Sequence, residues 1–280
     1  MTEIGRGNSG LTLGLPGIDG SAFTLAWAAV TDVGRRRMTN EDSYIVSPPI
    51  FAVADGMGGH LAGDLASAAV VNRLSDSAQN GFATTDDIER ALFEATYDIG
   101  IVAGDSDIGV GTTVTGAVLS EVEGRPYFAV FNIGDSRVYR WDRGELSQVT
   151  TDHSLVQELV DSGLISKQQA YQHPEGNIIT RAVGFEVKPV PDYVMIPVRA
   201  GLRLIVCSDG LNGELRDDRI RLHVAAGLPA QGTAESLVDA ALEAGGRDNV
   251  TVIVIDVLDA PVVDDLDDDD TAPDGRYGVR

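Results

Sequence analysis

The chain has 280 residues, of which 43% are hydrophobic and 23% charged, a composition that is typical of a folded globular protein and excludes global disorder. Its formal net charge of -22 argues against a nucleic-acid ligand, because contact with phosphate needs clustered Lys and Arg; it favours cations, although such a surplus also simply keeps a protein soluble. A single cysteine, Cys207, with no long apolar run and no leader pattern, predicts a cytoplasmic protein without disulfides or a membrane span.

The two ends of the chain are predicted to be unstructured. Residues 1–21 contain six glycines and a proline without hydrophobic periodicity, which indicates a flexible arm. Residues 260–280 form an acidic tail that cannot bury enough apolar surface to offset the entropy of ordering, and we expect it to be disordered. Residues 22–259 contain neither an internal repeat nor a linker, and we expect them to form one domain.

Apolar runs rich in β-branched residues alternate with amphipathic stretches through this central segment. The runs predict strands at 24–31, 50–54, 112–119, 127–133, 137–141, 202–207 and 250–257. Helical spacing predicts helices at 62–78, 85–104, 153–162, 166–172, 217–226 and 233–244, the second of them behind a capping signal formed by Thr84 and Asp87. Because strand follows strand without helices through residues 111–150, antiparallel pairing and an α+β fold class are favoured.

Aspartates recur at the predicted ends of strands and in the turns beside them. They are Asp42, Asp55, Asp135, Asp209 and Asp248. Each alone is most simply a turn residue, because an Asp side chain hydrogen-bonds the backbone of its own turn. If the fold brings them together, they repel one another unless protons or cations neutralise them, and oxygen ligands without Cys or His select Mg²⁺ or Mn²⁺. The spacing alone does not prove that they converge.

Six short motifs, in this order along the chain, resemble those of the metal-dependent type 2C serine/threonine protein phosphatases (the PPM family) in their compact bacterial form. The motifs are Arg37-x-x-Asn40-Glu41-Asp42, Asp55-Gly56-Met57-Gly58-Gly59-His60, Gly111-Thr112-Thr113, Gly134-Asp135-Ser136-Arg137, Ser208-Asp209-Gly210 and Asp248-Asn249-Val250-Thr251. The first begins at residue 37 and the last at residue 248, so the resemblance covers nearly all of the central segment. It implies a four-layer αββα sandwich, in which helix pairs flank two antiparallel β-sheets.

The resemblance also implies a centre of two metal ions, Mn²⁺ or Mg²⁺. Asp55 would bridge the two ions, the carbonyl of Gly56 would bind one of them, and Asp209 and Asp248 would bind the other. Glycine suits the position after Asp55, because it leaves the backbone carbonyl open to ions and their waters. Asp42 would act through metal-bound water.

A third, weaker metal site is implied by the bacterial pattern, in which Asp135 would join Asp209. The implied reaction is hydrolysis of phosphoserine and phosphothreonine in proteins, by attack of a hydroxide that bridges the two metal ions. Arg37 would bind the phosphoryl oxygens through its planar guanidinium, although from the residues alone Arg35 or Arg36 would serve as well.

The proton for the leaving alkoxide needs a donor, and His60 is the candidate general acid. A structural role for His60, a place at the edge of the substrate site, and donation by a metal-bound water instead are the alternatives. The expected partners are phosphoproteins, among them a Ser/Thr kinase, with no nucleic acid and no membrane. The protein is expected to be a monomer.

Two other functions compete with this prediction. A pseudophosphatase would keep the fold as a catalytically weak or inactive scaffold, but it would be expected to have lost metal ligands, and all five aspartates and Arg37 are present. A nucleotide-binding glycine loop at residues 56–63 lacks both G-x-G-x-x-G and G-K-[ST], and it lies in a strand-rich context.

Overall fold

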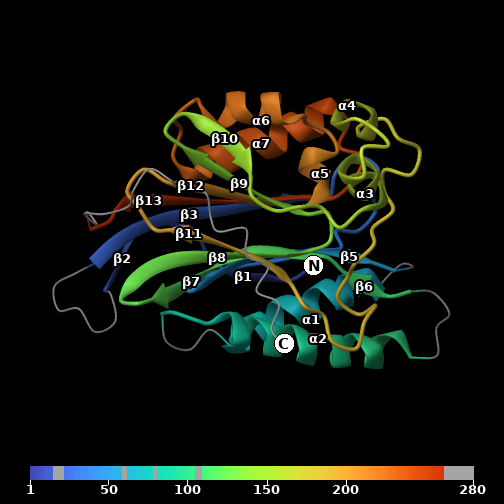
Figure 1. The fold of residues 1–280 in the computed structure, drawn as a ribbon, viewed down its shortest axis with the longest axis horizontal. Coiled ribbons are helices and arrows are strands. Elements are labelled where there is room, and N and C mark those ends of the chain that lie inside the picture. Colours follow the sequence, from blue (N-terminus) through green and yellow to red (C-terminus); the bar gives the residue numbers. More distant parts are fainter. Residues whose placement is uncertain (15–21, 59–61, 78–80, 105–108, 262–280) are drawn as a thin grey trace.

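The computed structural model describes residues 1–14, 22–58, 62–77, 81–104 and 109–261. Two β-sheets pack face to face, and helices cover the outer face of each (Figure 1). Helices α1 (Ala62–Ser77) and α2 (Thr85–Ala103) lie on the first sheet, and α6 (Asp217–Val224) and α7 (Ala230–Ala244) lie on the second. The predicted α+β class and four-layer αββα sandwich are confirmed.

The first sheet has seven strands in the order β1-β4-β5-β7-β8-β11, with β6 paired to β5. Its strands are β1 (Glu3–Gly5), β4 (Asp42–Ser47), β5 (Ile50–Met57), β6 (Gly111–Thr112), β7 (Val114–Val122), β8 (Arg125–Ile133) and β11 (Asp192–Pro197). All neighbouring pairs are antiparallel except β1 and β4, which run parallel. The expectation of purely antiparallel sheets is therefore wrong at this one edge.

The second sheet has six strands in the order β10-β9-β12-β13-β3-β2, and every neighbouring pair is antiparallel. Its strands are β2 (Asn8–Gly14), β3 (Ala22–Asp32), β9 (Arg137–Asp142), β10 (Glu145–Gln148), β12 (Arg203–Cys207) and β13 (Val250–Asp259). Three short helices, α3 (Leu155–Asp161), α4 (Lys167–Ala170) and α5 (Asp209–Asn212), lie at one end of the sandwich (Figure 1).

Three hydrophobic cores separate the four layers, and they explain why the strands read as continuous apolar runs. On β13, Ile253 and Ile255 pack between the sheets, whereas Val252 and Val254 pack towards α7. Successive side chains of a strand point to opposite faces, so a strand that is covered on both faces needs apolar residues at every position. The run at 250–257 was predictable as a strand for that reason.

The N-terminal segment differs from its prediction. Residues 1–21 were expected to be a flexible arm, but β1 pairs with β4 and β2 pairs with β3, one on each sheet. The glycines that suggested flexibility are compatible with these edge positions, where few side chains need to pack. Residues 15–21 lie outside the described residues, as do residues 262–280 of the predicted acidic tail.

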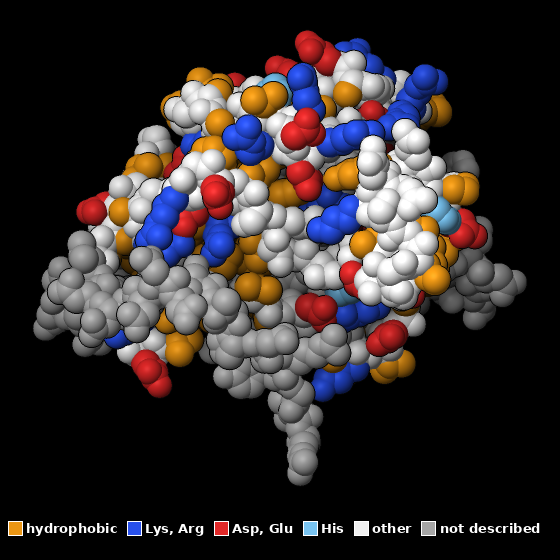
Figure 2. Space-filling view, turned by 45° about the horizontal axis from the view of Figure 1, so that its top comes forward, with side chains coloured by type: hydrophobic (Ala, Val, Ile, Leu, Met, Phe, Trp, Pro, Cys, Tyr) orange, Lys and Arg blue, Asp and Glu red, His pale blue; other side chains and the backbone are white. Residues whose placement is uncertain are grey.

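Most of the other predicted elements are found. Thr84 caps α2 through a capping box with Asp87, as its spacing indicated. Strands β4, β10 and β11 and helix α5 were not predicted. Among the described residues no helix is long and apolar enough to cross a membrane. Figure 2 shows basic and acidic side chains interspersed over the α6–α7 side of the molecule.

Candidate metal centre

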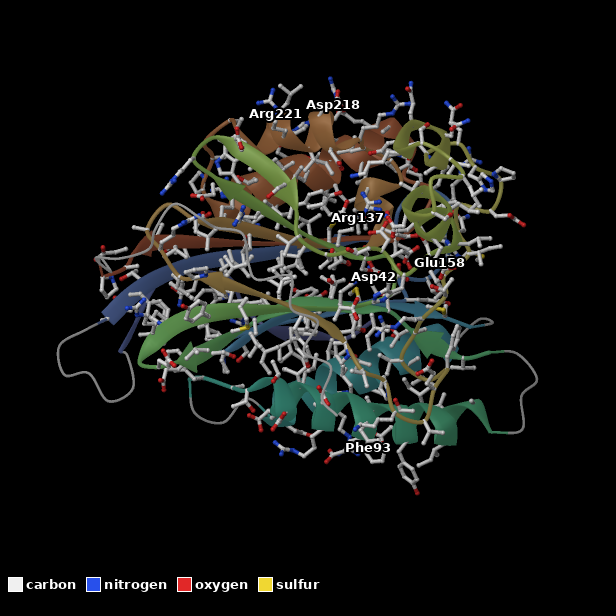
Figure 3. All side chains as sticks on the ribbon, viewed as in Figure 1. Asp42, Phe93, Arg137, Glu158, Asp218 and Arg221 are labelled. Carbon is white, nitrogen blue, oxygen red and sulfur yellow. The ribbon has the colours of Figure 1, made fainter. Side chains whose placement is uncertain are left out.

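The five predicted aspartates come from different elements that end at the same side of the sandwich. Asp42 begins β4 and is the register partner of Asp55 on β5. Asp135 lies in the turn between β8 and β9, Asp209 begins α5 directly after β12, and Asp248 precedes β13. Figure 3 places Asp42 between the two sheets, near the end where α3 and α5 lie. Strands that are distant in the chain thus deliver their carboxylates to one place.

Asp42 is fully buried, and its two carboxylate oxygens have different surroundings. The Oδ2 atom accepts hydrogen bonds from the Ser208 hydroxyl at 2.8 Å and from the Thr251 hydroxyl at 2.6 Å. The Oδ1 atom is buried without a hydrogen-bond partner, and so is Oδ1 of Asp209. A buried carboxylate oxygen without a partner is costly unless a proton or a cation neutralises it, so both oxygens fit a cation-binding role.

The pKa values of these carboxyl groups show that they act on one another. Burial, and then the charges of Asp42, Asp209, Asp135 and Asp248, raise the pKa of Asp55 well above its ordinary value. Burial is also the largest cause of the raised pKa values of Asp42, Asp135 and Asp209, each of which is raised further by a neighbouring aspartate. Such mutual repulsion is what a divalent cation relieves.

The cluster is open in shape. Within the described part of the chain, no three Asp, Glu, His or Cys side chains already converge on one position in the way that a closed metal site requires. The donor chemistry nevertheless fits Mn²⁺ or Mg²⁺, because the cluster offers only oxygen ligands, two of them buried and without partners.

The backbone around Asp55 is held by neighbouring hydroxyl groups and by close packing. The Thr112 hydroxyl donates to the Asp55 carbonyl at 2.8 Å, and the Asp55 amide donates to the Thr113 hydroxyl at 3.2 Å. At Gly56 a Cβ atom would overlap the carbonyl of Gly63 at the start of α1, so only glycine lets β5 pass this close to the helix. The predicted metal contact of the Gly56 carbonyl stays a prediction.

The turn that carries Asp135 is tied to the segment before α3. Its neighbour Arg137 is largely buried and forms an ion pair with Asp152 at 2.6 Å. The amide of Gly134 donates to Nδ1 of His153 at 3.0 Å, and Nε2 of His153 lies 3.1 Å from a carboxylate oxygen of Asp192. These contacts fix the direction in which the Asp135 turn faces.

Arg37 lies beside the cluster on the loop formed by residues 33–39. Its guanidinium donates to Oδ2 of Asp248 at 2.6 Å, while 54% of its side chain stays exposed. The hydrogen bond to Asp248 is the largest cause of its raised pKa. The Arg35 guanidinium is directed elsewhere, because its Nε donates to the carbonyl of Leu242 at the end of α7. Of these two arginines, only Arg37 is shown to contact the carboxylate cluster.

Asn249 holds this loop at both ends, a role that its place in a motif did not reveal. Its Nδ2 donates to the carbonyl of Val33 at 2.9 Å and to that of Thr39 at 3.0 Å, and its Oδ1 accepts from the amide of Glu41 at 2.8 Å. The side chain is 5% exposed and uses both of its amide hydrogens and its oxygen in these bonds. Through Asn249 the Arg37 loop is fixed relative to Asp248.

The structure places most of the predicted site residues, while their metal-binding and catalytic roles stay predictions. The five aspartates, Gly56 and Arg37 lie on segments that the fold brings together, whereas His60 lies outside the described residues. The sequence analysis missed the hydrogen bonds of Ser208 and Thr251 to Asp42 and the role of Asn249. These residues lie next to the motif aspartates, and only the folded register shows which carboxylate or carbonyl each of them reaches.

Comparison with known proteins identifies the family of this chain. Residues 35–244 match the family described as Protein phosphatase 2C. The serine/threonine protein phosphatase PstP of Mycobacterium tuberculosis is 38% identical over 249 residues, which cover 85% of this chain and 46% of the relative, so the chain spans about half the length of that protein. The serine/threonine phosphatase stp of Listeria monocytogenes is 36% identical over 239 residues, which cover 81% of this chain and 93% of the relative.

Solved structures of relatives share the fold. A crystal structure of Mycobacterium tuberculosis PstP/Ppp has a TM-score of 0.76 at 37% identity and covers 83% of this chain and 98% of its own. The catalytic domain of PstP in complex with two manganese ions has a TM-score of 0.75 at 37% identity and covers 84% of this chain and 99% of its own. With the motifs, the four-layer fold and the carboxylate cluster in agreement, the chain belongs to the protein phosphatase 2C family.

Proposed function

We propose that the protein is a metal-dependent serine/threonine protein phosphatase that hydrolyses phosphoserine and phosphothreonine. The observation that carries the proposal is the cluster of mutually repelling carboxylates with two buried oxygens that lack partners, beside an exposed arginine. The relatives support it, because they are named serine/threonine phosphatases and one of their structures holds two manganese ions.

Each part of the site has a distinct task in this proposal. Asp55, Asp209 and Asp248 are the candidates for binding two Mn²⁺ or Mg²⁺ ions directly, and Asp135 is the candidate for a third site. When bound, the cations supply charge neutralisation at the phosphoryl group and lower the pKa of the attacking water. Asp42, held by the hydroxyls of Ser208 and Thr251, orients solvent at the cluster.

Arg37 is placed to bind the phosphoryl oxygens of the substrate. Its guanidinium has five N–H donors, of which the Asp248 contact uses one, so others remain for two charge-assisted bonds to phosphate. Because Asp248 fixes one end of the guanidinium, the arginine loses little freedom when phosphate binds. His60 stays the candidate for protonating the leaving alkoxide.

Phosphate release tests this function directly. We expect the full chain to hydrolyse an aryl phosphate and a phosphothreonine peptide with Mn²⁺ or Mg²⁺, and to lose this activity with a chelator and in the Asp209→Asn variant. Activity that survives complete chelation would contradict metal dependence. A folded protein that binds Mn²⁺ but releases no phosphate from any substrate would support the pseudophosphatase instead.

Replacing Arg37 by alanine should mainly raise KM, because the change weakens phosphate binding and leaves the carboxylate cluster in place. We expect KM to rise about 10-fold, which is the loss of one charge-assisted contact. Steady-state kinetics with the aryl phosphate at saturating Mn²⁺ measure the effect, and Arg36→Ala is the matched control on the same loop. A fall in kcat with unchanged KM would show that Arg37 acts in the transition state only.

Asn249→Ala removes the side chain that fixes the Arg37 loop. We expect the free energy of unfolding to fall by about 1–3 kcal/mol, because two carbonyls and an amide lose their partner, and KM for the aryl phosphate to rise more than kcat falls. Urea unfolding and steady-state kinetics measure the two effects. Asn249→Asp keeps the acceptor for the Glu41 amide but sets a buried carboxylate against the two carbonyls, so it should destabilise the protein at least as much as the alanine variant. A destabilised variant with unchanged KM would limit Asn249 to a structural role.

The substrates, partners and location of the protein follow as proposals from this function. Phosphoproteins are the expected substrates. The expected partner is a Ser/Thr kinase whose phosphorylation of these substrates the enzyme reverses. A cytoplasmic location is supported by the single, buried cysteine, which suits a reducing compartment, and a monomer is proposed with it.

A further inference from the structure

The loop that carries Arg37 also presents an apolar side chain to solvent. Met38 is 98% exposed, the highest value among the large hydrophobic residues in the described part of the chain, ahead of Val187 at 83%. Single exposed apolar residues are ordinary on protein surfaces, so exposure alone does not indicate a function. The position of Met38 is what distinguishes it, because it is the direct neighbour of the arginine proposed to bind phosphate.

The exposure of Met38 is built into a rigid loop. Asn249 binds the carbonyls of Val33 and Thr39, the residues at the two ends of the loop. Between them the Arg35 amide donates to the carbonyl of Gly246 at 2.6 Å, and Gly34 takes a positive φ of 77° that favours glycine. A loop held at both ends and in its first half keeps Met38 in solvent as a fixed feature.

The loop is positively charged, although the protein as a whole has a large negative net charge. The chain has 21 Lys and Arg against 43 Asp and Glu, yet Arg35, Arg36 and Arg37 follow one another directly before Met38. Arg35 is bound to α7 through the Leu242 carbonyl, and Arg37 is bound to Asp248. Arg36 is exposed, and neither of those two contacts involves it.

We propose that Arg36 and Met38 form a recognition surface for the residues that flank the phosphorylated residue of a protein substrate. The preferred substrate class is a phosphopeptide with an acidic residue and an apolar side chain close to the phosphothreonine or phosphoserine. This inference rests on the proposed phosphatase function and deepens it.

The chemistry of the two side chains sets this preference. An arginine guanidinium binds a carboxylate through two parallel, charge-assisted hydrogen bonds. A methionine side chain is unbranched and polarisable, so it adapts to apolar partners of different shapes. Because the loop is already ordered, substrate binding does not bear the entropy of fixing it. A substrate held by its phosphate at Arg37 brings its flanking residues to the neighbouring positions.

A peptide series tests the inference with the full chain and Mn²⁺. Each phosphothreonine peptide has two variable residues on either side of the phosphothreonine: one is Glu or Gln, and the other is Leu or Ser. An aryl phosphate, which has no flanking residues, is the reference. The quantity measured is kcat/KM for each peptide divided by kcat/KM for the aryl phosphate. The variants are Arg36→Gln and Met38→Gln, and the matched control is Phe93→Gln, a half-exposed apolar residue on α2, far from Asp42 (Figure 3).

We expect the parent enzyme to prefer the peptide with Glu and Leu. Arg36→Gln should lower the preference for Glu over Gln about 5-fold, and Met38→Gln should lower the preference for Leu over Ser about 5-fold, the size of one surface contact. Phe93→Gln should leave both preferences unchanged. A parent enzyme that hydrolyses all the peptides equally, or variants that alter every peptide and the aryl phosphate alike, would overturn the inference. Failure to hydrolyse even the aryl phosphate would instead overturn the proposed function.

Discussion

The Asp55→Asn variant is expected to lose more than about 100-fold in kcat and yet to be more stable than the parent when both are free of metal. The activity should fall because asparagine lacks the negative charge that, in the proposed function, would hold the cations, and even groups that only hold a metal ligand contribute 10–100-fold. The stability should rise because the partly buried Asp55 lies among four other carboxylates that repel its charge. The melting temperature in a chelator should increase by about 2–4 °C.

Phosphate release at saturating Mn²⁺ and thermal unfolding with a chelator measure the two effects on one preparation. Asp86→Asn, at an exposed aspartate in the first turn of α2, is the matched control, because it removes the same charge outside the cluster. It should change neither activity nor stability appreciably. Asp55→Asn with near-parent activity would show that Asp55 is not a metal ligand, and lower stability without metal would show that the carboxylates do not repel one another.

The stability of the protein is expected to fall less steeply with rising pH in the presence of divalent cations than in their absence. Burial and neighbouring carboxylates raise the pKa of Asp42 to about 7 and that of Asp135 to about 8, from an ordinary value of 3.8. Between the ordinary pKa and these raised pKa values, the folded, metal-free protein binds more protons than the unfolded chain. Its free energy of unfolding therefore falls as pH rises through this range. From pH 4 to pH 8 we expect the free energy of unfolding to fall by several kcal/mol, because each unit of pKa shift corresponds to about 1.4 kcal/mol.

Bound Mn²⁺ should oppose this trend, because cations and protons compete for the same carboxylate oxygens. At a Mn²⁺ concentration of 100 times Kd, binding adds about 2.7 kcal/mol at pH 8 and less at pH 5. Urea unfolding from pH 5 to pH 8, with a chelator and with Mn²⁺, measures both slopes. Asp192 does not contribute to the pH dependence between pH 5 and pH 8. Its hydrogen bond to His153 lowers its pKa, so its contribution to stability changes only below pH 4. Parallel slopes in the two series would contradict a shared site for protons and cations.

The sequence predicts best those elements whose apolar residues follow a regular pattern over many positions. Strands β12 and β13 and the helix pair α1 and α2 were predictable, because burial demands apolar residues with a regular period. Strand β11, by contrast, is an edge strand with Asp192 and Met195 exposed, so its pattern is weak. The segment 1–14 was misjudged because its glycines also suit flexible chains, and its pairing is set by the edges that β4 and β3 offer.

The site was predictable in its carboxylates and not in the contacts that hold them. The resemblance of the motifs to a known family indicated Asp42, Asp55 and Asp209, but the hydroxyl of Thr251 reaches Asp42 across 209 positions of the chain. A contact of that kind depends on the packing of the two sheets, which no local pattern encodes. The same is true of Asn249, whose three hydrogen bonds depend on where the Arg37 loop lies in the folded molecule.

The first fourteen residues have a consequence for how the protein is shielded from its own copies. Strand β1 covers the open flank of β4, and β2 covers that of β3, so each sheet ends in a short strand. A shortened chain starting at residue 22 would expose the backbone amides and carbonyls along one edge of β4 and one edge of β3. Exposed strand edges of this kind can pair with the strands of another copy, so we expect residues 1–14 to protect the protein against aggregation.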